Sequence, residues 1–460
     1  MSPRTDLQLD FNNMLAERIG TEGIELGQLE KIEPSLRALS RGLHDLRKLG
    51  QMPYRDLPYQ EDLLNKVRLR AEEIRSRYET VLVLGTGGSS LGALCLVQAL
   101  ASTAVRGCRI ELCQDLHAHT WRKLARTLVP EKTFIIVVSK SGKTIETLAA
   151  FLYFRQWLLN AMGEKRAKDH LLFITDPKAG PLRKIAESEQ LETMAVPPGV
   201  GGRFSVLSTV GLLPAACAGI EIGEVVAGAR RMDERCSKED LWKNPAMLSA
   251  ALHYLADRQR GRKIRVVMPY DDRLGPFTDW FAQLWDESIG KLLSLKGEEI
   301  RTGTTVLKAE GSLDQHSQLQ LFLEGPRDKV VNLVEVTKVA EDLILPRCYE
   351  QQVEFKSLVG RSVHDLLQIQ KNAVEAALTR SMIPNLTWIL DELNGDSLGQ
   401  LLYLAEVETV LSGALYNINP FDQPGVEVIK KYVKGLLAEK GFEEYRQAIE
   451  GATKDRRFVI

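Results

Sequence analysis

The feature that most constrains this chain is a short apolar run that ends abruptly in small polar residues. Residues 134–138 are apolar, residues 139–144 read SKSGKT, and a helical pattern begins at Ile145. A strand, a loop of hydroxyl residues and a helix present free backbone N–H groups and the positive end of the helix dipole to an anion. The arrangement favours a phosphate-binding loop. The alternative is an ordinary turn in which Ser and Thr only cap the helix.

The same alternation recurs along the first half of the chain. Residues 81–84 form an apolar run, the loop GTGGSS follows at 85–90, and a helical pattern covers 91–100. Further strands are expected at 109–112 and 171–175. Strands that alternate with helices predict an α/β fold, in which a parallel sheet carries helices on both faces. Ligands bind beyond the carboxyl ends of such strands, so the GTGGSS and SKSGKT loops are expected to converge on one ligand.

A second α/β segment begins near residue 244. Strands are expected at 264–268 and 330–336, and a helix at 278–293. The alternation of strand and helix returns here without any repeat of the sequence itself. Two similar sheets are therefore the expectation.

Helices are expected to flank the two α/β segments. Apolar residues have helical spacing over 6–19, 27–49 and 59–78, and again over 398–416 and 426–439. A chain of 460 residues is too long for a single core. The predicted division is a helical segment at 1–78, a first α/β domain at 79–230, a second at 231–400 and a helical arm at 401–460.

Composition and charge argue against several classes of protein. Lys and Arg total 60 and Asp and Glu total 61, so the electrostatic footprint of a nucleic-acid-binding protein is missing. No apolar run approaches the roughly 18 residues of a membrane span, and the polar N-terminus lacks the core of a signal peptide. The six cysteines are scattered without a CxxC pair. This indicates reduced thiols and a cytoplasmic location, not a metal cluster or a disulfide scaffold.

Two nucleotide-binding motifs are matched only in part. The loop GTGGSS has Ser90 where the dinucleotide fingerprint requires glycine, and Asp115 lies further on than the usual acidic ribose ligand. The residues SGKT resemble the end of a P-loop, but Val137 stands where that motif requires its first glycine. The NTPase interpretation is rejected on this point, and a nicotinamide oxidoreductase is weakened. Two Ser/Gly loops suited to a small phosphorylated ligand remain.

Glu287 is a candidate for chemistry that also has a structural interpretation. It lies inside the helix expected at 278–293, where an i, i+4 pair with Lys291 on a solvated face is worth only a few tenths of a kcal/mol. Gly290 is unfavourable in a helix interior by about 1 kcal/mol. A glycine beside this carboxylate therefore indicates that something approaches there.

Three further residues are also candidates for a role in the chemistry. Arg203 follows two glycines, which allow a close approach to a ligand. His316 is expected at the start of a helix that Asp314 or Ser312 caps, where a structural hydrogen bond is the alternative role, and no second histidine lies at metal-ligand spacing. Lys430 follows Glu427 in an expected helix, where a position on an ordinary solvent-exposed face is the alternative.

Several of these stretches together resemble the phosphoglucose isomerase family. GVGGRFSVLSTVG at 199–211 and GALYNINPFDQPGVEVIKK at 413–431 are similar to its two long signatures. VLGTGGSSLG, VVSKSGKTIET, WDESIGK and DQHSQ are similar to its remaining active-site segments. The resemblance covers residues 81–431, and the length suits the shorter bacterial form of the family without an appended second enzyme.

The resemblance implies a fold, an activity and an assembly. The fold is two three-layer α/β/α sugar-isomerase (SIS) domains with mainly parallel sheets, a helical N-terminal segment and a helical C-terminal arm. The activity is an aldose–ketose isomerisation of glycolysis and gluconeogenesis, between glucose 6-phosphate and fructose 6-phosphate through a cis-enediolate, without metal or organic cofactor. The assembly is a homodimer that binds a sugar phosphate and neither nucleic acid nor membrane.

The resemblance also implies roles for individual residues. Glu287 is expected to be the catalytic carboxylate, Arg203 to lie beside the reacting carbons, and His316 and Lys430 to open the sugar ring. His316 is expected to reach the site of the partner subunit, as the histidine does in the family. Apart from the resemblance, Glu146, two residues beyond Thr144, is a candidate to orient His316 through a carboxylate–imidazole bond. The substrate-binding residues expected from the family are Gly88, Ser89, Ser139, Lys140, Ser141, Thr144 and Gln423.

Some alternatives stay open at this point. Lys143 stands where relatives commonly have Thr or a similar small residue, and it either adds affinity for the phosphate or points into solvent. A non-catalytic sugar-phosphate sensor would keep the phosphate loop but would not need the four charged or ionisable residues together. An isomerase for mannose phosphate or an aminosugar phosphate would differ only in the shape of its site.

Overall fold

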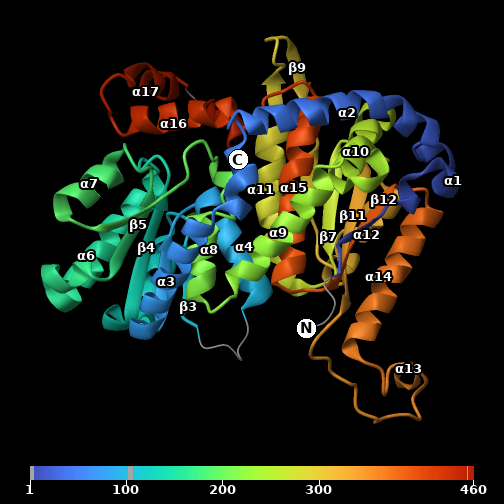
Figure 1. Cartoon of the computed structure of the whole chain (residues 1–460), viewed down its shortest axis with the longest axis horizontal. Helices are drawn as coiled ribbons and strands as arrows, with labels where there is room; N and C mark the ends of the chain where they lie inside the picture. The colour runs from blue at the N-terminus through green and yellow to red at the C-terminus, as the bar shows by residue number, and fades with distance from the viewer. Residues whose placement is uncertain (1–4, 102–106, 453) are drawn as a thin grey trace.

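The computed structural model describes residues 5–101, 107–452 and 454–460, and contains two five-stranded sheets that stand side by side (Figure 1). The first sheet lies within residues 80–195, and the second is built mainly from residues 264–392. Both sheets are mainly parallel and carry helices on their faces. The α/β fold expected from the sequence is therefore confirmed.

The first sheet is parallel throughout, with the strand order β3-β2-β4-β5-β6. Because β3 and β4 lie on opposite sides of β2, the loops after β2 and β4 border the crevice in which such sheets bind ligands. These are the GTGGSS and SKSGKT loops. The strands are β2 (Thr80–Leu84), β3 (Arg109–Cys113), β4 (Thr133–Ser139), β5 (Leu171–Thr175) and β6 (Glu192–Ala195).

The second sheet repeats this order in its four parallel strands, β10-β7-β11-β12, and adds β1 antiparallel at the edge. A separate hairpin, β8–β9, follows the helix α11 (Gly275–Ile289). The strands are β1 (Gln8–Asp10), β7 (Ile264–Pro269), β8 (Lys291–Leu293), β9 (Glu299–Thr302), β10 (Thr305–Lys308), β11 (Lys329–Lys338) and β12 (Asn385–Glu392).

Successive residues of the strands face different cores. Val81 and Val83 belong to the large core between the sheets, whereas Leu82 and Leu84 belong to the core beneath the outer helices of the first sheet. Strands buried on both faces require nearly continuous apolar runs. This is why short apolar runs predicted these strands.

Helices fill the space between the two sheets and cover their outer faces (Figure 1). The helices that contribute to the central core are α2 (Leu26–Lys48), α3 (Glu61–Arg77), α4 (Leu91–Leu100), α8 (Thr209–Cys217), α9 (Ile222–Cys236), α10 (Pro245–Arg260), α11 (Gly275–Ile289) and α15 (Gly395–Leu415). The outer helices are α5 (Ala118–Thr127), α6 (Ile145–Lys168) and α7 (Pro181–Glu189) on the first sheet, and α12 (Leu319–Glu324) and α14 (Val363–Arg380) on the second. The remaining helices are α1 (Ala16–Ile19), α13 (Val353–Lys356), α16 (Pro424–Leu436) and α17 (Glu443–Glu450).

The helix expected at residues 6–19 is wrong. Residues 8–10 form β1, which pairs with β12 through Leu9 and Trp388, and α1 has only four residues. Pairing with the edge of the second sheet outweighs the weak helical propensity of this segment.

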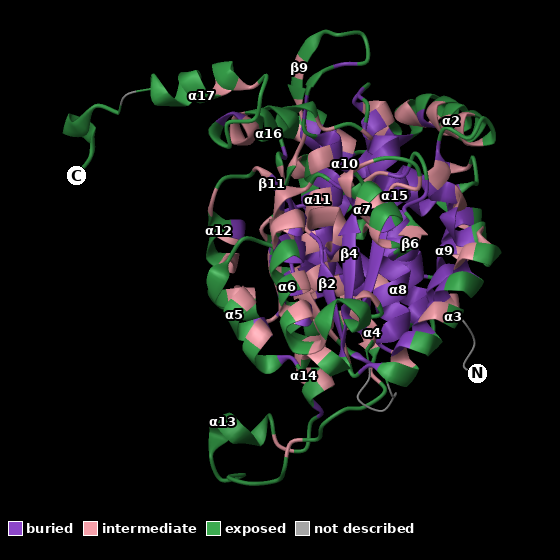
Figure 2. Cartoon of the chain, turned by 90° about the vertical axis from the view of Figure 1, so that its left-hand side faces the viewer, coloured by how far each residue is buried: buried purple, intermediate pink, exposed green. Residues whose placement is uncertain are grey.

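The predicted division of the chain into domains stays a prediction. α9 and α15 run through residues 231 and 401 without a break, and they pack against each other in the central core. Beyond α15, the arm of α16 and α17 is largely exposed (Figure 2). In residues 5–101, 107–452 and 454–460, no helix is long and apolar enough to cross a membrane.

A buried ion pair fastens the central helices to the second sheet. Arg265 on β7 is 1% exposed, and its Nη1 lies 2.7 Å from Oε1 of Glu408 on α15, which is fully buried. The guanidinium also lies over the rings of Phe281 and Trp285 on α11. Removing one partner of such a pair leaves an uncompensated charge in the core.

Arg265→Met is therefore expected to destabilise the fold by about 3–5 kcal/mol, and the double variant Arg265→Met/Glu408→Met by much less. The measurement is the midpoint of urea unfolding. Arg301→Met is the matched control, because the ion pair of Arg301 with Glu299 is exposed and is worth at most about 1 kcal/mol. Equal losses in the single and double Arg265 variants would contradict the role of the charge.

Candidate active site

The SKSGKT loop lies at the carboxyl end of β4 and leads directly into α6. Oγ of Ser139 and Oγ1 of Thr144 lie 3.0 Å apart, at the two ends of the loop. Gly142 has a φ of +62°, and a Cβ there would lie 3.0 Å from the backbone nitrogen of Leu182. Only glycine adopts this conformation without strain. The turn therefore places hydroxyl groups and the N-terminus of α6 around one point.

The remaining loop residues differ in what they contact. Nζ of Lys140 donates to the carbonyl of Val200 at 2.8 Å, which ties the loop to the Gly-rich segment before Arg203. Oγ of Ser141 accepts from the backbone N–H of Lys143. Lys143 is exposed and makes no ion pair with any residue that the structure describes.

The GTGGSS loop meets the segment of Arg203 at van der Waals distance. A Cβ on Gly88 would lie 2.2 Å from the carbonyl carbon of Gly202, so this approach excludes every residue but glycine. Ser89 ends a short 3₁₀ helix, Gly87–Ser89, in the same loop. The first sheet thus brings together the loops that the sequence predicted to converge.

Arg203 is the most heavily bonded side chain of the site. It is 3% exposed. Nε donates to Oγ of Ser288 at 2.7 Å, Nη1 lies 3.1 Å from Oε2 of Glu287, and Nη2 donates to the carbonyl of Pro420 at 2.6 Å. Burial lowers the pKa of this guanidinium, and the carboxylate of Glu287 opposes the shift. An arginine stays charged under these conditions, so the site holds a fixed cation.

Glu287 lies in the last turn of α11, with a quarter of its side chain exposed. Gln283, one turn earlier on the same face, points its Nε2 at Oε2 of Glu287 from 3.5 Å and lies against Gly87. The amide oxygen of Gln283 is buried and has no hydrogen-bond partner among the described residues. Gln283 was not among the residues expected at the site. The i, i+4 spacing to Glu287 was the signal that would have revealed it.

Two predictions about this helix are wrong: the solvent-exposed pair of Glu287 with Lys291, and the continuation of the helix to residue 293. α11 ends at Ile289, and Gly290 is its C-cap with an ordinary φ of −70°. Lys291 starts β8, is 7% exposed, and donates to the carbonyls of Glu287 and Ser288 at 2.7 and 3.0 Å. The group that approaches Gly290 is backbone: a Cβ on Gly303 would lie 3.1 Å from the Cα of Gly290.

Gln423 enters the site from the turn between α15 and α16. Its Oε1 accepts from Nη1 of Arg203 at 3.1 Å, and the carbonyl of Asp422 accepts from Nη2 at 3.1 Å. Next to Asp422, the ring of Phe421 packs against two other rings. Its centroid lies 5.4 Å from that of Phe204 and 6.0 Å from that of Tyr54. Arg203, Glu287 and Gln423 therefore meet, although they come from three distant parts of the chain.

His316 does not join this group within one chain. It ends a 3₁₀ helix, Leu313–His316, beyond the carboxyl end of β10, where Gly311 donates to the carbonyl of Pro269. Glu287 lies toward the amino ends of these strands, because the 15-residue helix α11 between the parallel strands β7 and β10 runs back along the sheet for about 22 Å. His316 is exposed, and Glu146, in the first turn of α6, makes no contact with it among the described interactions.

The single capped helix expected around His316 is also wrong. Ser312 makes no side-chain cap. Asp314 accepts from the backbone N–H of Glu310. The helical conformation is interrupted at Ser317, before α12 begins.

Lys430 also stands apart from the group around Arg203. It lies on α16, where its side chain is 60% exposed and pairs with Glu427 at 2.5 Å. The solvated helix face that the sequence allowed is what a single chain shows.

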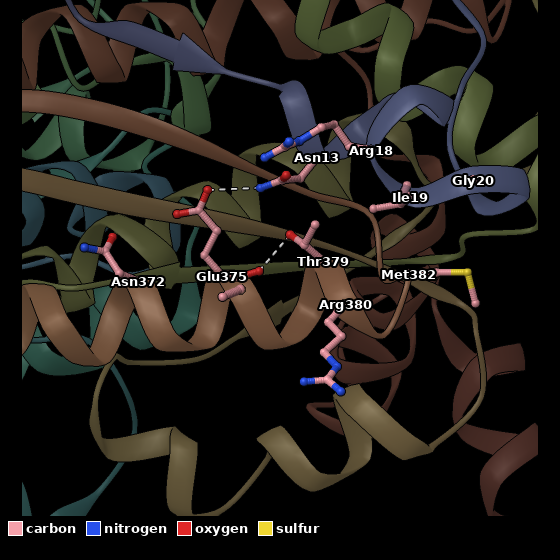
Figure 3. Close-up of a pocket in the computed structure, with 10 residues that line it drawn as sticks. Asn13, Arg18, Ile19, Gly20, Asn372, Glu375, Thr379, Arg380 and Met382 are labelled. Atoms are coloured by element: carbon pink, nitrogen blue, oxygen red, sulfur yellow. Dashed lines mark hydrogen bonds between the residues drawn. The ribbon is translucent and has the colours of Figure 1, made fainter.

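Two hollows of the structure lie elsewhere. One, of about 710 Å³, is bordered by α1 and α14 (Figure 3). Its two arginines, Arg18 and Arg380, do not converge on a common point. A larger one, of about 1080 Å³, lies at the carboxyl ends of the second sheet and reaches Leu313. Among the described residues, no group of three or more His, Cys, Asp or Glu side chains is arranged to hold a metal ion.

Comparison with known proteins agrees with this arrangement. The family model described as phosphoglucose isomerase matches residues 71–455. The chain is 41% identical to a glucose-6-phosphate isomerase of Carboxydothermus hydrogenoformans, over 99% of both chains. It is 38% identical to one of Thermus thermophilus, over 89% of this chain and 96% of the relative.

Solved structures agree as well. A crystal structure of a hypothetical protein from Thermus thermophilus matches with a TM-score of 0.86 and 35% identity, over 94% of this chain and all of the other. A glucose-6-phosphate isomerase from Chlamydia trachomatis matches with a TM-score of 0.73 and 26% identity, over 84% of this chain and 76% of the other. The fold and the resemblance read from the motifs are confirmed, and the chain belongs to the phosphoglucose isomerase family.

Proposed function

We propose that this chain is an aldose–ketose isomerase that interconverts glucose 6-phosphate and fructose 6-phosphate. One observation carries the proposal most: a half-buried carboxylate, Glu287, lies 3.1 Å from a guanidinium that is held immobile by its other bonds. A base beside a fixed cation suits proton abstraction next to a carbonyl. The SKSGKT loop, tied to the same segment through Val200, suits the phosphate of the substrate.

The proton transfer uses a single base. The aldehyde at C1 of the open sugar acidifies the hydrogen on C2. Glu287 removes this proton and returns it to C1, while the hydroxyl proton on O2 passes to O1. The transfer between the carbons needs one carboxylate on one face of the sugar. The cis-enediolate formed between the two steps carries negative charge, and Arg203 stabilises it without reorganisation, because its orientation is already set. The phosphate contacts supply binding energy away from the reacting carbons, and this energy orients the substrate.

Ring opening precedes this step. The sugar arrives mainly as a closed ring, so one proton must reach the ring oxygen and another must leave the C1 hydroxyl. His316 and Lys430 are the groups proposed for these transfers. Both are exposed in a single chain, and neither contacts Arg203 or Glu287 among the described interactions.

A homodimer resolves this separation. About 22 Å of α11 separates the carboxyl ends of the strands of the second sheet from their amino ends. This is too far for His316 to serve the site of its own chain. We propose that it serves the site of the partner subunit. The arm that carries Lys430 exposes apolar side chains that suit an interface: Val428, Ile429, Leu436 and Leu437.

Other sugar phosphates remain as a second candidate class, because the shape of the site decides between them. A sensor is the weaker candidate. It would need the SKSGKT loop but not the pairing of Glu287 with Arg203. Conversion of fructose 6-phosphate to glucose 6-phosphate by the purified protein separates these possibilities, and a folded protein without activity would favour the sensor.

Glu287→Gln is expected to lower kcat by about 10²- to 10⁴-fold, because it removes the base but keeps the shape of the side chain. Exchange of the C2 proton with solvent, followed by NMR, should be lost in parallel. Glu299→Gln, on an exposed hairpin strand, is the control and should behave as the wild type. Continued proton exchange in Glu287→Gln would show that another group is the base.

Thr144→Val is expected to weaken inhibition by inorganic phosphate by about tenfold or more, because a hydrogen bond to a charged group is worth about 1.5–3 kcal/mol. KM should rise by a similar factor, and kcat should change less. Thr127→Val, at the exposed end of α5, is the control. An unchanged inhibition constant in Thr144→Val would count against the phosphate loop.

Mixing two inactive variants tests the shared site. In a mixed dimer of Glu287→Gln and His316→Ala subunits, one site has both residues intact if the histidine acts across the interface. Random reassociation should then restore about a quarter of the wild-type activity, since half of the dimers are mixed and half of their sites are intact. If the histidine served its own chain, mixing would restore none.

A further inference from the structure

Lys291 is a buried ammonium group directly behind the proposed base. Its side chain is 5% exposed, which is unusual for a lysine, and Nζ donates to two backbone carbonyls, those of Glu287 and Ser288. Both carbonyls belong to the last turn of α11, where four C=O groups lack an intrahelical partner. The ammonium therefore fixes the backbone of the residue that carries the base.

The same ammonium reaches the turn that carries Gln423. Nζ lies 3.7 Å from Oδ1 of Asp422, whose side chain is half exposed. The backbone carbonyl of Asp422 accepts from Nη2 of Arg203. Lys291 and Arg203 thus hold the end of α11 and the turn before α16 together from two sides.

We propose that Lys291 is a positioning residue of the isomerase reaction, which holds the backbone of Glu287 and the Asp422–Gln423 turn in register. This role rests on the proposed function. The contacts are made with carbonyls and with one carboxylate, so it is the charged form of Lys291 that does this. Loss of the proton would weaken the bonds to the end of α11.

Three charged groups face Lys291. Burial and the positive charge of Arg203 lower the pKa of Lys291, and the carboxylates of Asp422 and Glu287 oppose this shift. The ammonium therefore loses its proton at a lower pH than a lysine in water. The wild-type kcat should fall reversibly on the alkaline side as this happens.

Kinetics of three variants test the proposal, with fructose 6-phosphate as the substrate. Lys291→Met should lower kcat by about 10- to 100-fold with little change in KM, because a misplaced base affects the reaction more than binding. Its alkaline decline should disappear. Lys291→Arg should recover part of kcat and stay active at higher pH, because a guanidinium keeps its proton.

Asp422→Asn keeps the test decisive if substitution of a buried lysine prevents folding. The side chain of Asp422 is half exposed, and its backbone carbonyl is unchanged by the substitution. Without this carboxylate, the alkaline decline of kcat should begin at lower pH. Lys296→Met, an exposed lysine in the turn between β8 and β9, is the control and should leave kcat and its pH profile unchanged.

The outcomes separate this role from the isomerase function itself. If the wild type is active and Lys291→Met has the same kcat and the same pH profile, the positioning role alone is overturned. An unchanged pH profile in Asp422→Asn would do the same. A wild type without isomerase activity would overturn both proposals.

Discussion

The arrangement of the candidate site depends on one buried guanidinium, that of Arg203. Arg203 directs its donors to Ser288 and Glu287 of α11, and to Gln423 and the backbone of the turn before α16. A buried cation is tolerated only when its donors are satisfied, so these segments must stand where they do. The guanidinium itself lies in a loop of the first α/β unit, next to Phe204 of the central core. One side chain thus joins the two halves of the molecule at the site.

The two sheets share a strand order but contribute different elements to the site. The first sheet presents two loops of Gly and Ser at its crevice, and glycine is required at Gly88 because the backbone of Gly202 lies against it. The second sheet supplies α11 instead, and the end of that helix completes the site on the first. Lys291 stabilises this end by bonding its free carbonyls. Under the proposed function, the base on α11 and the loops for the phosphate therefore come from different units.

A single chain leaves part of the proposed machinery unused. His316 and Lys430 are exposed, and so is most of the arm of α16 and α17 (Figure 2). Several of the exposed side chains of this arm are apolar. The groups proposed for ring opening are thereby separated in space, within one subunit, from those proposed for proton transfer. The proposed dimer would make ring opening conditional on assembly, whereas the pair of Glu287 with Arg203 and the SKSGKT loop are already formed within each chain.

The sequence by itself determined the fold class and most strands, and it predicted the candidate site residues. Strands buried on both faces need apolar runs, and a turn such as that at Gly142 needs glycine, so both leave local marks. Residues 8–10 carry no such mark, because β1 exists only through its pairing with β12. The burial of Lys291, the end of α11 at Ile289 and the partners of Arg203 were likewise decided by tertiary structure. Each depends on groups distant in the chain, whose approach no local pattern records.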